Sequence, residues 1–247
     1  GEKLMQKLNE LNVNSEGMVI QEQGWATPSY VKPYKNKNEL NRIDFGNFNK
    51  LDTETLNCLL SLLEKKLQDQ DIVIISQQIV GSLFVDEFIE KMLILINKFC
   101  DTLFIVDSRH NSEDFPSAIL KLNDFTAESM VGNTPSKGDG ITRENAIKTA
   151  KTLCKKFKKT IFITRGINGC ILVDEGVIKE IPSIKITGKI DTVGAGDSML
   201  AGICLGLVSG QDAYNSACLG SLAAAVTIQK LYQTGTVSPE ELLMMTS

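Results

Sequence analysis

From Leu51 onward the sequence alternates between short, mostly apolar runs and longer stretches with helical periodicity, and no other feature constrains the fold as strongly. The apolar runs lie at residues 72–75, 103–106, 119–122 and 161–163, and the periodic stretches lie at 52–68, 83–99 and 142–157. Strands without polar alternation are typically buried on both faces of a parallel sheet. The pattern therefore predicts an α/β fold, with a mostly parallel central sheet and helices on both faces.

Residues 18–45 break this pattern and predict a small β lid. Short β-like runs at residues 18–20, 29–31 and 41–43 are separated by glycine and proline, which favour turns and edge strands. We expect this lid to pair between two subunits of a homodimer.

A β-hairpin is predicted later in the chain, where runs at residues 171–173 and 177–181 flank a turn at 174–176. The chain opens at residues 2–11 with apolar side chains on one helical face. We expect residues 1–247 to form one domain with the lid as an appendage.

The composition excludes several classes of protein. The chain has 247 residues, of which 43% are hydrophobic and 23% charged, as in ordinary globular proteins. Its formal net charge of −4 argues against binding of nucleic acid, which requires clustered Lys and Arg. Because no apolar stretch approaches the roughly 20 residues of a membrane span, we expect no membrane partner.

The cysteines and the single histidine restrict the chemistry further. The six cysteines are scattered, form no C-x-x-C pair, and mostly fall in apolar runs expected in the core. The start at Gly1 lacks the apolar core of a signal peptide, so both features indicate a reduced, cytoplasmic protein. Because His110 is the single histidine, a His-rich zinc site is excluded.

Polar residues directly follow several of the predicted strands. They are Asp107, Arg109, Asn123, and Thr164 with Arg165, which Gly166 follows. Any one of them could simply end a strand, but together they line one edge of the predicted sheet. In open α/β sheets, ligands bind at the carboxyl ends of the strands, so these residues are candidate ligand contacts.

The segment 191–197, Asp-Thr-Val-Gly-Ala-Gly-Asp, leads into an apolar helical stripe that continues to Val208. Its glycines therefore lie at a helix N-terminus, where unpaired N–H groups and the helix dipole attract anions. Asp197 lies beside this anion hole and could accept a proton from an attacking hydroxyl. The spacing alone is equally compatible with a tight turn followed by an ordinary acidic residue at the start of a helix.

The segment 191–198 resembles the signature of the PfkB/ribokinase family of carbohydrate kinases. The similarity extends along essentially the whole chain. It is closest to the heptose 7-phosphate kinase half of bacterial ADP-heptose synthase, on the segments 41–45, 122–123, 163–165 and 236–242. The segment matches neither a Walker A loop nor the G-x-G-x-x-G dinucleotide fingerprint.

The resemblance implies a ribokinase-like fold and a set of site residues. It implies Asp197 as the catalytic base and Gly194, Ala195 and Gly196 as the anion hole. Residues implied to contact ATP are Asn123, Thr164, Arg165, Gly166 and Gly169 along the phosphates, with Ala224 and residues 233–235, Gly235 included, beside the adenine. The implied cofactors are ATP and Mg²⁺, with K⁺ held by backbone carbonyls near Asp191 and Val193.

The sequence departs from the family pattern at the metal site. The family's magnesium motif is Asn-x-x-Glu, but Thr126 occupies the Glu position after Asn123, and Glu128 is the candidate substitute. Mg²⁺ usually keeps several waters and binds few carboxylates, so a displaced acid could still organise it.

The acceptor side departs as well. The heptose kinase branch places Lys and Arg two residues apart where this chain has Tyr30 and Lys32. The candidate substrate contacts are Lys32, Arg42, Asp107 and Arg109. The family's N-terminal strands and the nucleotidyltransferase half of the bifunctional synthase do not occur within residues 1–247, so we expect the kinase step at most.

The resulting prediction is a transferase, an ATP-dependent carbohydrate kinase acting on a hydroxyl of a sugar or sugar phosphate, with a heptose 7-phosphate as one candidate. Two alternatives stay open. One is a non-catalytic nucleotide-binding or regulatory relative, and the other is a kinase of a nucleoside or another small alcohol.

Overall fold

A computed structural model describes residues 1–36, 38–46, 48–79, 83–135, 140–233 and 235–245 of the chain. The chain divides into two compact units. Unit 1 comprises Gly1–Gln70 and Gln77–Thr102, and unit 2 comprises Asp71–Ser76 and Leu103–Ser247.

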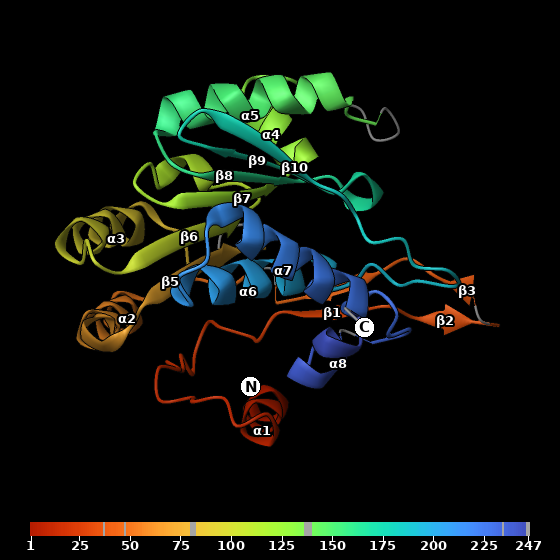
Figure 1. The fold of residues 1–247 in the computed structure, drawn as a ribbon. Coiled ribbons are helices and arrows are strands. Elements are labelled where there is room, and N and C mark those ends of the chain that lie inside the picture. Colours follow the sequence, from red (N-terminus) through yellow and green to blue (C-terminus); the bar gives the residue numbers. More distant parts are fainter. Residues whose placement is uncertain (37, 47, 80–82, 136–139, 234, 246–247) are drawn as a thin grey trace. The chain divides into compact units, whose positions relative to one another are not determined.

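Unit 2 is built on a six-stranded sheet with the strand order β10-β9-β8-β7-β6-β5 (Figure 1). The strands are β5 (Ile72–Gln77), β6 (Leu103–Ser108), β7 (Ile119–Asn123), β8 (Ile161–Thr164), β9 (Cys170–Asp174) and β10 (Val177–Ile181). Strand β7 runs parallel to both β6 and β8, whereas β9 is antiparallel to both β8 and β10. The predicted parallel strands and the predicted hairpin are confirmed.

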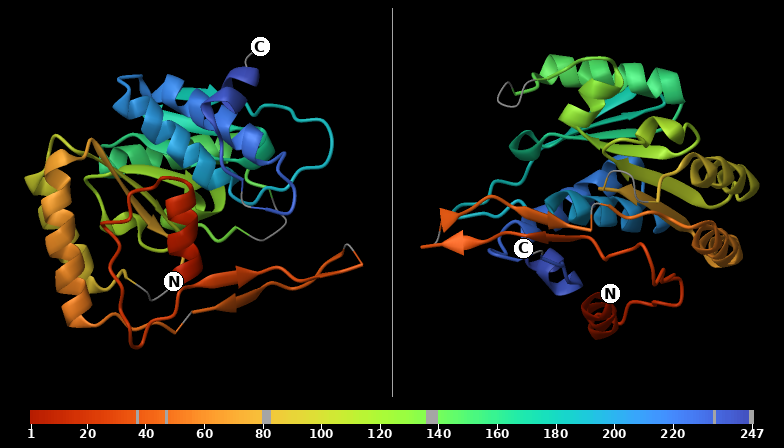
Figure 2. Two further views of the ribbon diagram at one scale, coloured as in Figure 1. Left: turned by 90° about the horizontal axis from the view of Figure 1, so that it is seen from below. Right: turned by 180° about the vertical axis from the view of Figure 1, so that it is seen from behind.

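Helices cover both faces of this sheet, as predicted. The helices of unit 2 are α4 (Asp124–Met130), α5 (Arg143–Phe157), α6 (Ala195–Val208), α7 (Ala213–Thr227) and α8 (Pro239–Met244), with short 3-10 helices η2 (Ser112–Asp114) and η3 (Gly166–Asn168). Helices α4 and α5 lie on one face and α6 and α7 on the other (Figures 1 and 2).

Side-chain alternation along the strands explains why both faces are apolar. In β8, Phe162 is fully buried in the core that includes Ile203 of α6. Its neighbours Ile161 and Ile163 are also fully buried. Because successive strand residues point to opposite faces, these two isoleucines lie on the α5 face of the sheet.

Helices α6 and α7 approach each other closely because glycines face each other at their contact. A Cβ atom added to Gly202 would lie 2.7 Å from the Cα atom of Gly220. A Cβ atom added to Gly220 would lie 2.6 Å from the carbonyl oxygen of Met199. Real Cβ atoms do not come this close to backbone atoms, so larger residues would force the two helices apart.

Unit 1 contains helices and a two-stranded antiparallel ribbon. The helices are α1 (Glu2–Glu10), α2 (Thr53–Lys66), the 3-10 helix η1 (Leu67–Asp69) and α3 (Asp86–Lys98). One side of the ribbon consists of β1 (Ser29–Val31) and β2 (Tyr34–Lys35), and the other side consists of β3 (Asn38–Glu39) and β4 (Ile43–Phe45). The ribbon is drawn in orange in Figure 2. Strand β1 pairs with β4, and β2 pairs with β3, both antiparallel.

The ribbon agrees with the predicted β character of residues 18–45 in part. Strand β1 is as predicted, and the predicted strand at 41–43 begins instead at Ile43. The predicted strand at 18–20 is wrong, since these residues are irregular and Ile20 is 73% exposed. Its β-branched residues have no pairing strand in the part of the chain that is described, so their β propensity does not produce a strand.

The cysteines differ in their exposure to solvent. All six cysteines are free. Cys154, Cys170 and Cys204 are buried as expected, whereas Cys58 and Cys100 are exposed. Within the described residues, no helix combines the length and apolarity needed to cross a bilayer.

We predict that Gly202→Ala destabilises the protein by about 1–3 kcal/mol, because the new methyl group overlaps the backbone of α7. Helix propensity alone would favour Ala over Gly by about 1 kcal/mol, so the two effects have opposite signs. The measurement is urea unfolding followed by circular dichroism. The exposed neighbour Ala201→Val serves as the control and should change stability by less than about 1 kcal/mol. A stabilised Gly202→Ala variant would contradict the proposed close packing.

Candidate active site at the carboxyl ends of the strands

Helix α6 begins with an open N-terminus at the glycine-rich turn. Gly194 is its N-cap and has φ 80° and ψ −4°, a left-handed conformation that strongly favours glycine. No side chain caps the helix, and the N–H groups of Gly196 and Asp197 have no acceptor among the residues that the structure describes. Asp197 is exposed in the first turn. The positive end of the helix dipole is thus available to an anion, as predicted from the sequence pattern.

A buried lysine lies next to this open helix end. The side chain of Lys121, in β7, is only 5% exposed and forms an ion pair of 2.6 Å with Asp107 at the end of β6. A Cβ atom added to Gly196 would lie 3.3 Å from Lys121 Nζ, so the ammonium group reaches the first turn of α6. A cation and the positive end of a helix dipole repel each other, and an anion placed between them would be attracted by both.

Sequence reasoning missed Lys121, although a signal was present. The residue interrupts the apolar run at 119–122, and a charged side chain inside a strand buried on both faces is almost always paired. Its partner Asp107 was predicted as a substrate contact, and the structure engages it with Lys121.

The ends of β7 and β8 place two further predicted residues side by side. Asn123 and Thr164 are register partners in the parallel ladder. The Asn123 side chain accepts a hydrogen bond of 2.7 Å from the Thr126 N–H and thereby caps α4. The Thr164 hydroxyl donates a hydrogen bond of 3.2 Å to the Leu122 carbonyl. Asn123 remains exposed, so its side chain is accessible at the sheet edge.

Arg165, the next residue, is largely buried. One terminal nitrogen of its guanidinium donates a hydrogen bond of 2.9 Å to the Ile141 carbonyl. Its Nε is buried and has no hydrogen-bond partner within the described residues. Burial raises the pKa of the nearby Asp124 carboxyl above its usual value. The Phe125 N–H and the positive charge of Arg165 lower this pKa, but their effects are smaller. The buried, incompletely paired guanidinium is consistent with an anion contact at this strand end.

The two glycines that follow Arg165 differ in their surroundings. Gly169 has φ 79°, and a Cβ atom there would overlap the Ile181 carbonyl oxygen at 2.1 Å. Glycine is therefore required at position 169 by the approach of β10. Gly166 is exposed, and a Cβ atom there would have no neighbour within 4 Å. The packing within unit 2 thus explains Gly169 without any ligand.

Glu128, the predicted metal ligand, is buried and hydrogen-bonded within unit 2. Glu128 is 4% exposed, and its carboxylate accepts hydrogen bonds of 2.6 Å from the Thr149 hydroxyl and 2.5 Å from the Asn133 amide. Thr126 and Glu128 are two residues apart on α4, so they point to opposite sides of the helix. The sequence position suggested a substitute for the missing Glu, but this geometry supports a structural role between α4 and α5.

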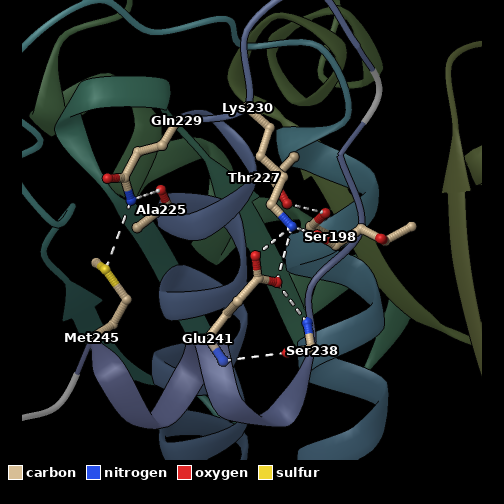
Figure 3. Close-up of polar contacts among 9 residues, drawn as sticks. Ser198, Ala225, Thr227, Gln229, Lys230, Ser238, Glu241 and Met245 are labelled. Carbon is tan, nitrogen blue, oxygen red and sulfur yellow. Dashed lines mark hydrogen bonds and ion pairs between the residues drawn. The ribbon is translucent and has the colours of Figure 1, made fainter.

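The end of α7 is hydrogen-bonded to both flanks of the glycine-rich turn, and Figure 3 shows the contact on the Ser198 side. The hydroxyls of Ser198 and Thr227 lie 2.6 Å apart, and Thr227 is fully buried. The Asp191 N–H donates a hydrogen bond of 2.8 Å to the Ile228 carbonyl. The end of α7 therefore helps to fix the position of the turn.

Two predicted adenine contacts lie on or after this helix. Ala224 is half-buried on α7 and packs against the core of unit 2. A Cβ atom added to Gly235 would lie 2.9 Å from Cδ of Lys230. Thr234, the predicted contact beside it, lies outside the described residues.

The remaining predicted acceptor contacts fall in different units. Arg42 belongs to unit 1, where it forms two hydrogen bonds of 2.6 and 2.8 Å with Asp44 and stacks over the Tyr30 ring at 4.4 Å. Lys32 is half-buried in unit 1, and Arg109 is exposed in unit 2. Among the described residues, no three His, Cys, Asp or Glu side chains gather into a metal site.

Comparison with known proteins gives consistent results. The sequence profile of the pfkB family carbohydrate kinases matches residues 1–240. The bifunctional protein HldE of Hydrogenovibrio crunogenus is 27% identical over 98% of this chain and 48% of its own length. The chain spans about half the length of the curated relatives it matches.

Solved structures share the fold. Ribokinase from Thermotoga maritima has a TM-score of 0.74 at 18% identity, over 99% of this chain and 76% of that chain. Phosphofructokinase-2 from Escherichia coli in complex with potassium has a TM-score of 0.76 at 18% identity, over 98% of this chain and 76% of that chain. The predicted ribokinase-like fold is thereby confirmed.

Proposed function

Because the chain belongs to the pfkB family of carbohydrate kinases, we propose that it transfers the γ-phosphoryl group of ATP to a hydroxyl of a sugar or sugar phosphate. One observation carries this proposal. The open N-terminus of α6 and the Lys121 ammonium converge at Gly196, where the absence of a Cβ leaves room for a phosphoryl oxygen. Backbone N–H groups and a buried cation are the donors that stabilise charge on a transferring phosphoryl group.

In the proposed reaction, Asp197 accepts the proton of the acceptor hydroxyl. The acceptor oxygen then forms a bond to the γ-phosphorus as the bond from that phosphorus to the β,γ-bridging oxygen breaks, and ADP leaves. Gly194, Ala195, Gly196 and Lys121 hold the negative oxygens of the phosphoryl group. Asn123, Thr164, Arg165 and Gly166 lie at the strand ends where the remaining phosphates would bind.

We propose that Mg²⁺ arrives with the nucleotide rather than in a protein cage. Mg²⁺ commonly binds through substrate phosphates and water with one or two carboxylates, and it would offset the negative charge of the phosphates. Glu128 is unsuited to it because its carboxylate is buried and hydrogen-bonded. K⁺ near the carbonyls of Asp191 and Val193 is proposed because a relative of the same fold was solved with potassium.

A heptose 7-phosphate is the proposed acceptor class. Its support is the resemblance to the kinase half of HldE proteins, the curated relatives that match most of this chain. Lys32, Arg42, Asp107 and Arg109 are the proposed contacts. The Arg42 guanidinium already holds Asp44, so an acceptor phosphate would have to compete with that carboxylate.

We predict that Asp197→Asn lowers kcat by about 10²–10⁴-fold, because the amide cannot accept the proton of the acceptor hydroxyl. ATP affinity should change little, since the N–H groups of the turn remain. The measurement is a coupled ADP-release assay over a panel of sugars and sugar phosphates, with calorimetry for ATP binding. Chelation of divalent cations and replacement of K⁺ by choline test the proposed ions in the same assay.

The exposed carboxylate of Asp101, in unit 1, provides the matched control, and Asp101→Asn should retain wild-type turnover. Near-normal turnover by Asp197→Asn would exclude Asp197 as the base. ATP binding by the wild-type chain without turnover of any acceptor would instead favour a regulatory, non-catalytic relative.

We predict that Lys121→Met lowers kcat by about 10²-fold or more, because one donor to the transferring phosphoryl group is lost. The variant also removes the ammonium partner of the Asp107 carboxylate, whose side chain is 14% exposed. The double variant Lys121→Met with Asp107→Asn removes the charge of that carboxylate as well and should remain equally slow. Recovery of kcat in the double variant would show that Lys121 only neutralises Asp107.

We also propose that the ribbon of unit 1 mediates a homodimer. Tyr30, Val31, Ile43 and Phe45, in β1 and β4, are 45–54% exposed, and a short apolar ribbon readily adds strands from a second copy. Light scattering should give the mass of a dimer for the wild type and of a monomer for Ile43→Lys. Val177→Lys, an exposed strand position in unit 2, should remain dimeric. A monomeric wild type at tens of micromolar would contradict this proposal.

A further inference from the structure

Lys230, just after α7, joins three segments of unit 2 through a single ammonium group (Figure 3). It donates a hydrogen bond to the carbonyl of Thr236. It also contacts both carboxylate oxygens of Glu241 in α8, at 2.7 and 2.9 Å. The lysine stem lies against Gly235, where a Cβ atom would be 2.9 Å from Cδ. We call Lys230, Gly235, Thr236, Ser238 and Glu241 the Lys230 latch.

The acidic partner of the lysine is shared with the cap of α8. The Ser238 hydroxyl accepts a hydrogen bond of 3.3 Å from the Glu241 N–H, and the Glu241 carboxylate accepts one of 2.8 Å from the Ser238 N–H. This reciprocal capping box fixes the start of the helix. The pKa of the Glu241 carboxyl is held below its usual value. The largest contribution comes from the Lys230 side chain, and a smaller one comes from the Ser238 N–H. The carboxylate is therefore charged at neutral pH and available to the lysine.

The same end of α7 contacts the glycine-rich turn before α6. Thr227 and Ile228 are hydrogen-bonded to Ser198 and Asp191, which flank the glycine-rich segment. Residues 227–230 thus connect the turn on one side with Gly235 and α8 on the other. Gln229 adds a second, weaker connection, since its amide lies 3.7 Å from the Met245 sulfur.

A contribution to the overall stability of the fold does not explain the role of Lys230. The side chains of Lys230 and Glu241 are 24% and 37% exposed, and partly exposed ion pairs of this kind contribute little to the stability of the fold. The Ser238 and Glu241 cap would form without Lys230. The specific contribution of the lysine is to hold the Gly235 to Thr236 segment at a fixed place relative to the end of α7.

We propose that Lys230 is a positioning residue for nucleotide binding: it holds the Gly235 to Thr236 segment in the place where Gly235 contacts the nucleotide base. This inference rests on the proposed function, in which Gly235 lies beside the adenine. When only a fraction of molecules has the segment in place, the apparent dissociation constant rises in inverse proportion to that fraction. Lys230 touches no reacting atom, so the chemical step and the acceptor are not affected.

The test is Lys230→Met, which keeps most of the apolar stem against Gly235 and removes the ammonium group. We expect the KM and the calorimetric Kd for ATP to rise about 5–10-fold, as for a segment that is in place in about 10–20% of molecules. The KM of the acceptor and kcat should stay within about twofold of wild type. Lys156→Met is the matched control, because Lys156 is an exposed lysine of unit 2 paired with Glu113 at 3.6 Å, and it should leave both KM values unchanged.

A second variant separates the lysine contact from the helix cap. Glu241→Gln retains a capping-box side chain but loses the charge that Lys230 binds, so ATP affinity should fall by less than in Lys230→Met. Because the two residues share one interaction, the double variant should bind ATP no more weakly than Lys230→Met alone. Additive losses in the double variant would contradict a common latch.

The outcomes are distinguishable from those of the proposed function. A wild-type chain that binds no ATP would overturn the proposed function, and the latch with it. If the wild type binds ATP and Lys230→Met binds it equally well, the latch alone is wrong. Parallel changes in the KM values of ATP and acceptor, with a lower melting temperature, would show a general structural role and also overturn the inference.

Discussion

The close contact between α6 and α7 is the constraint on which the rest of unit 2 depends. Gly202 and Gly220 allow the two backbones to meet without intervening side chains. The pair is then hydrogen-bonded at the end nearest the glycine-rich turn, through Ser198 and Thr227. Helix α6 is therefore held at a fixed position against the sheet, and its open N-terminus lies beside Lys121 at the end of the strands. A packing requirement in the core thus determines where the open N-terminus of α6 lies.

The charges around that N-terminus explain how the site tolerates its own electrostatics. Lys121 is only 5% exposed and lies beside the positive end of a helix dipole, so both burial and the dipole disfavour its positive charge. The 2.6 Å contact with Asp107 offsets part of this unfavourable free energy. A phosphoryl group would provide the missing negative charge only when substrate is bound. Such an arrangement is prepared before the reaction, which is the condition under which fixed charges are most effective in catalysis.

Local patterns predicted the fold well, because strand and helix assignments depend mainly on neighbouring residues. The apolar runs of β6, β7 and β8 and the start of α6 were correctly placed from periodicity and from the glycine-rich segment. What the sequence alone could not reveal was non-local. The run at 18–20 has β propensity but no pairing strand among the described residues. Glu128 became buried because Thr149 and Asn133 lie opposite it, and Lys121 reached Gly196 from a segment about 75 residues away.

The glycine contact between α6 and α7 also limits how the molecule can move. Two helices that touch backbone to backbone, with the Gly202 and Gly220 positions opposed, cannot slide along each other without collision. Any adjustment of unit 2 to an incoming nucleotide is therefore expected in the segments without such contacts, namely the turn before Ala195 and the chain after Thr227. The helix pair acts as a rigid frame, and the hydrogen bonds at Asp191 and Lys230 attach the neighbouring segments to it.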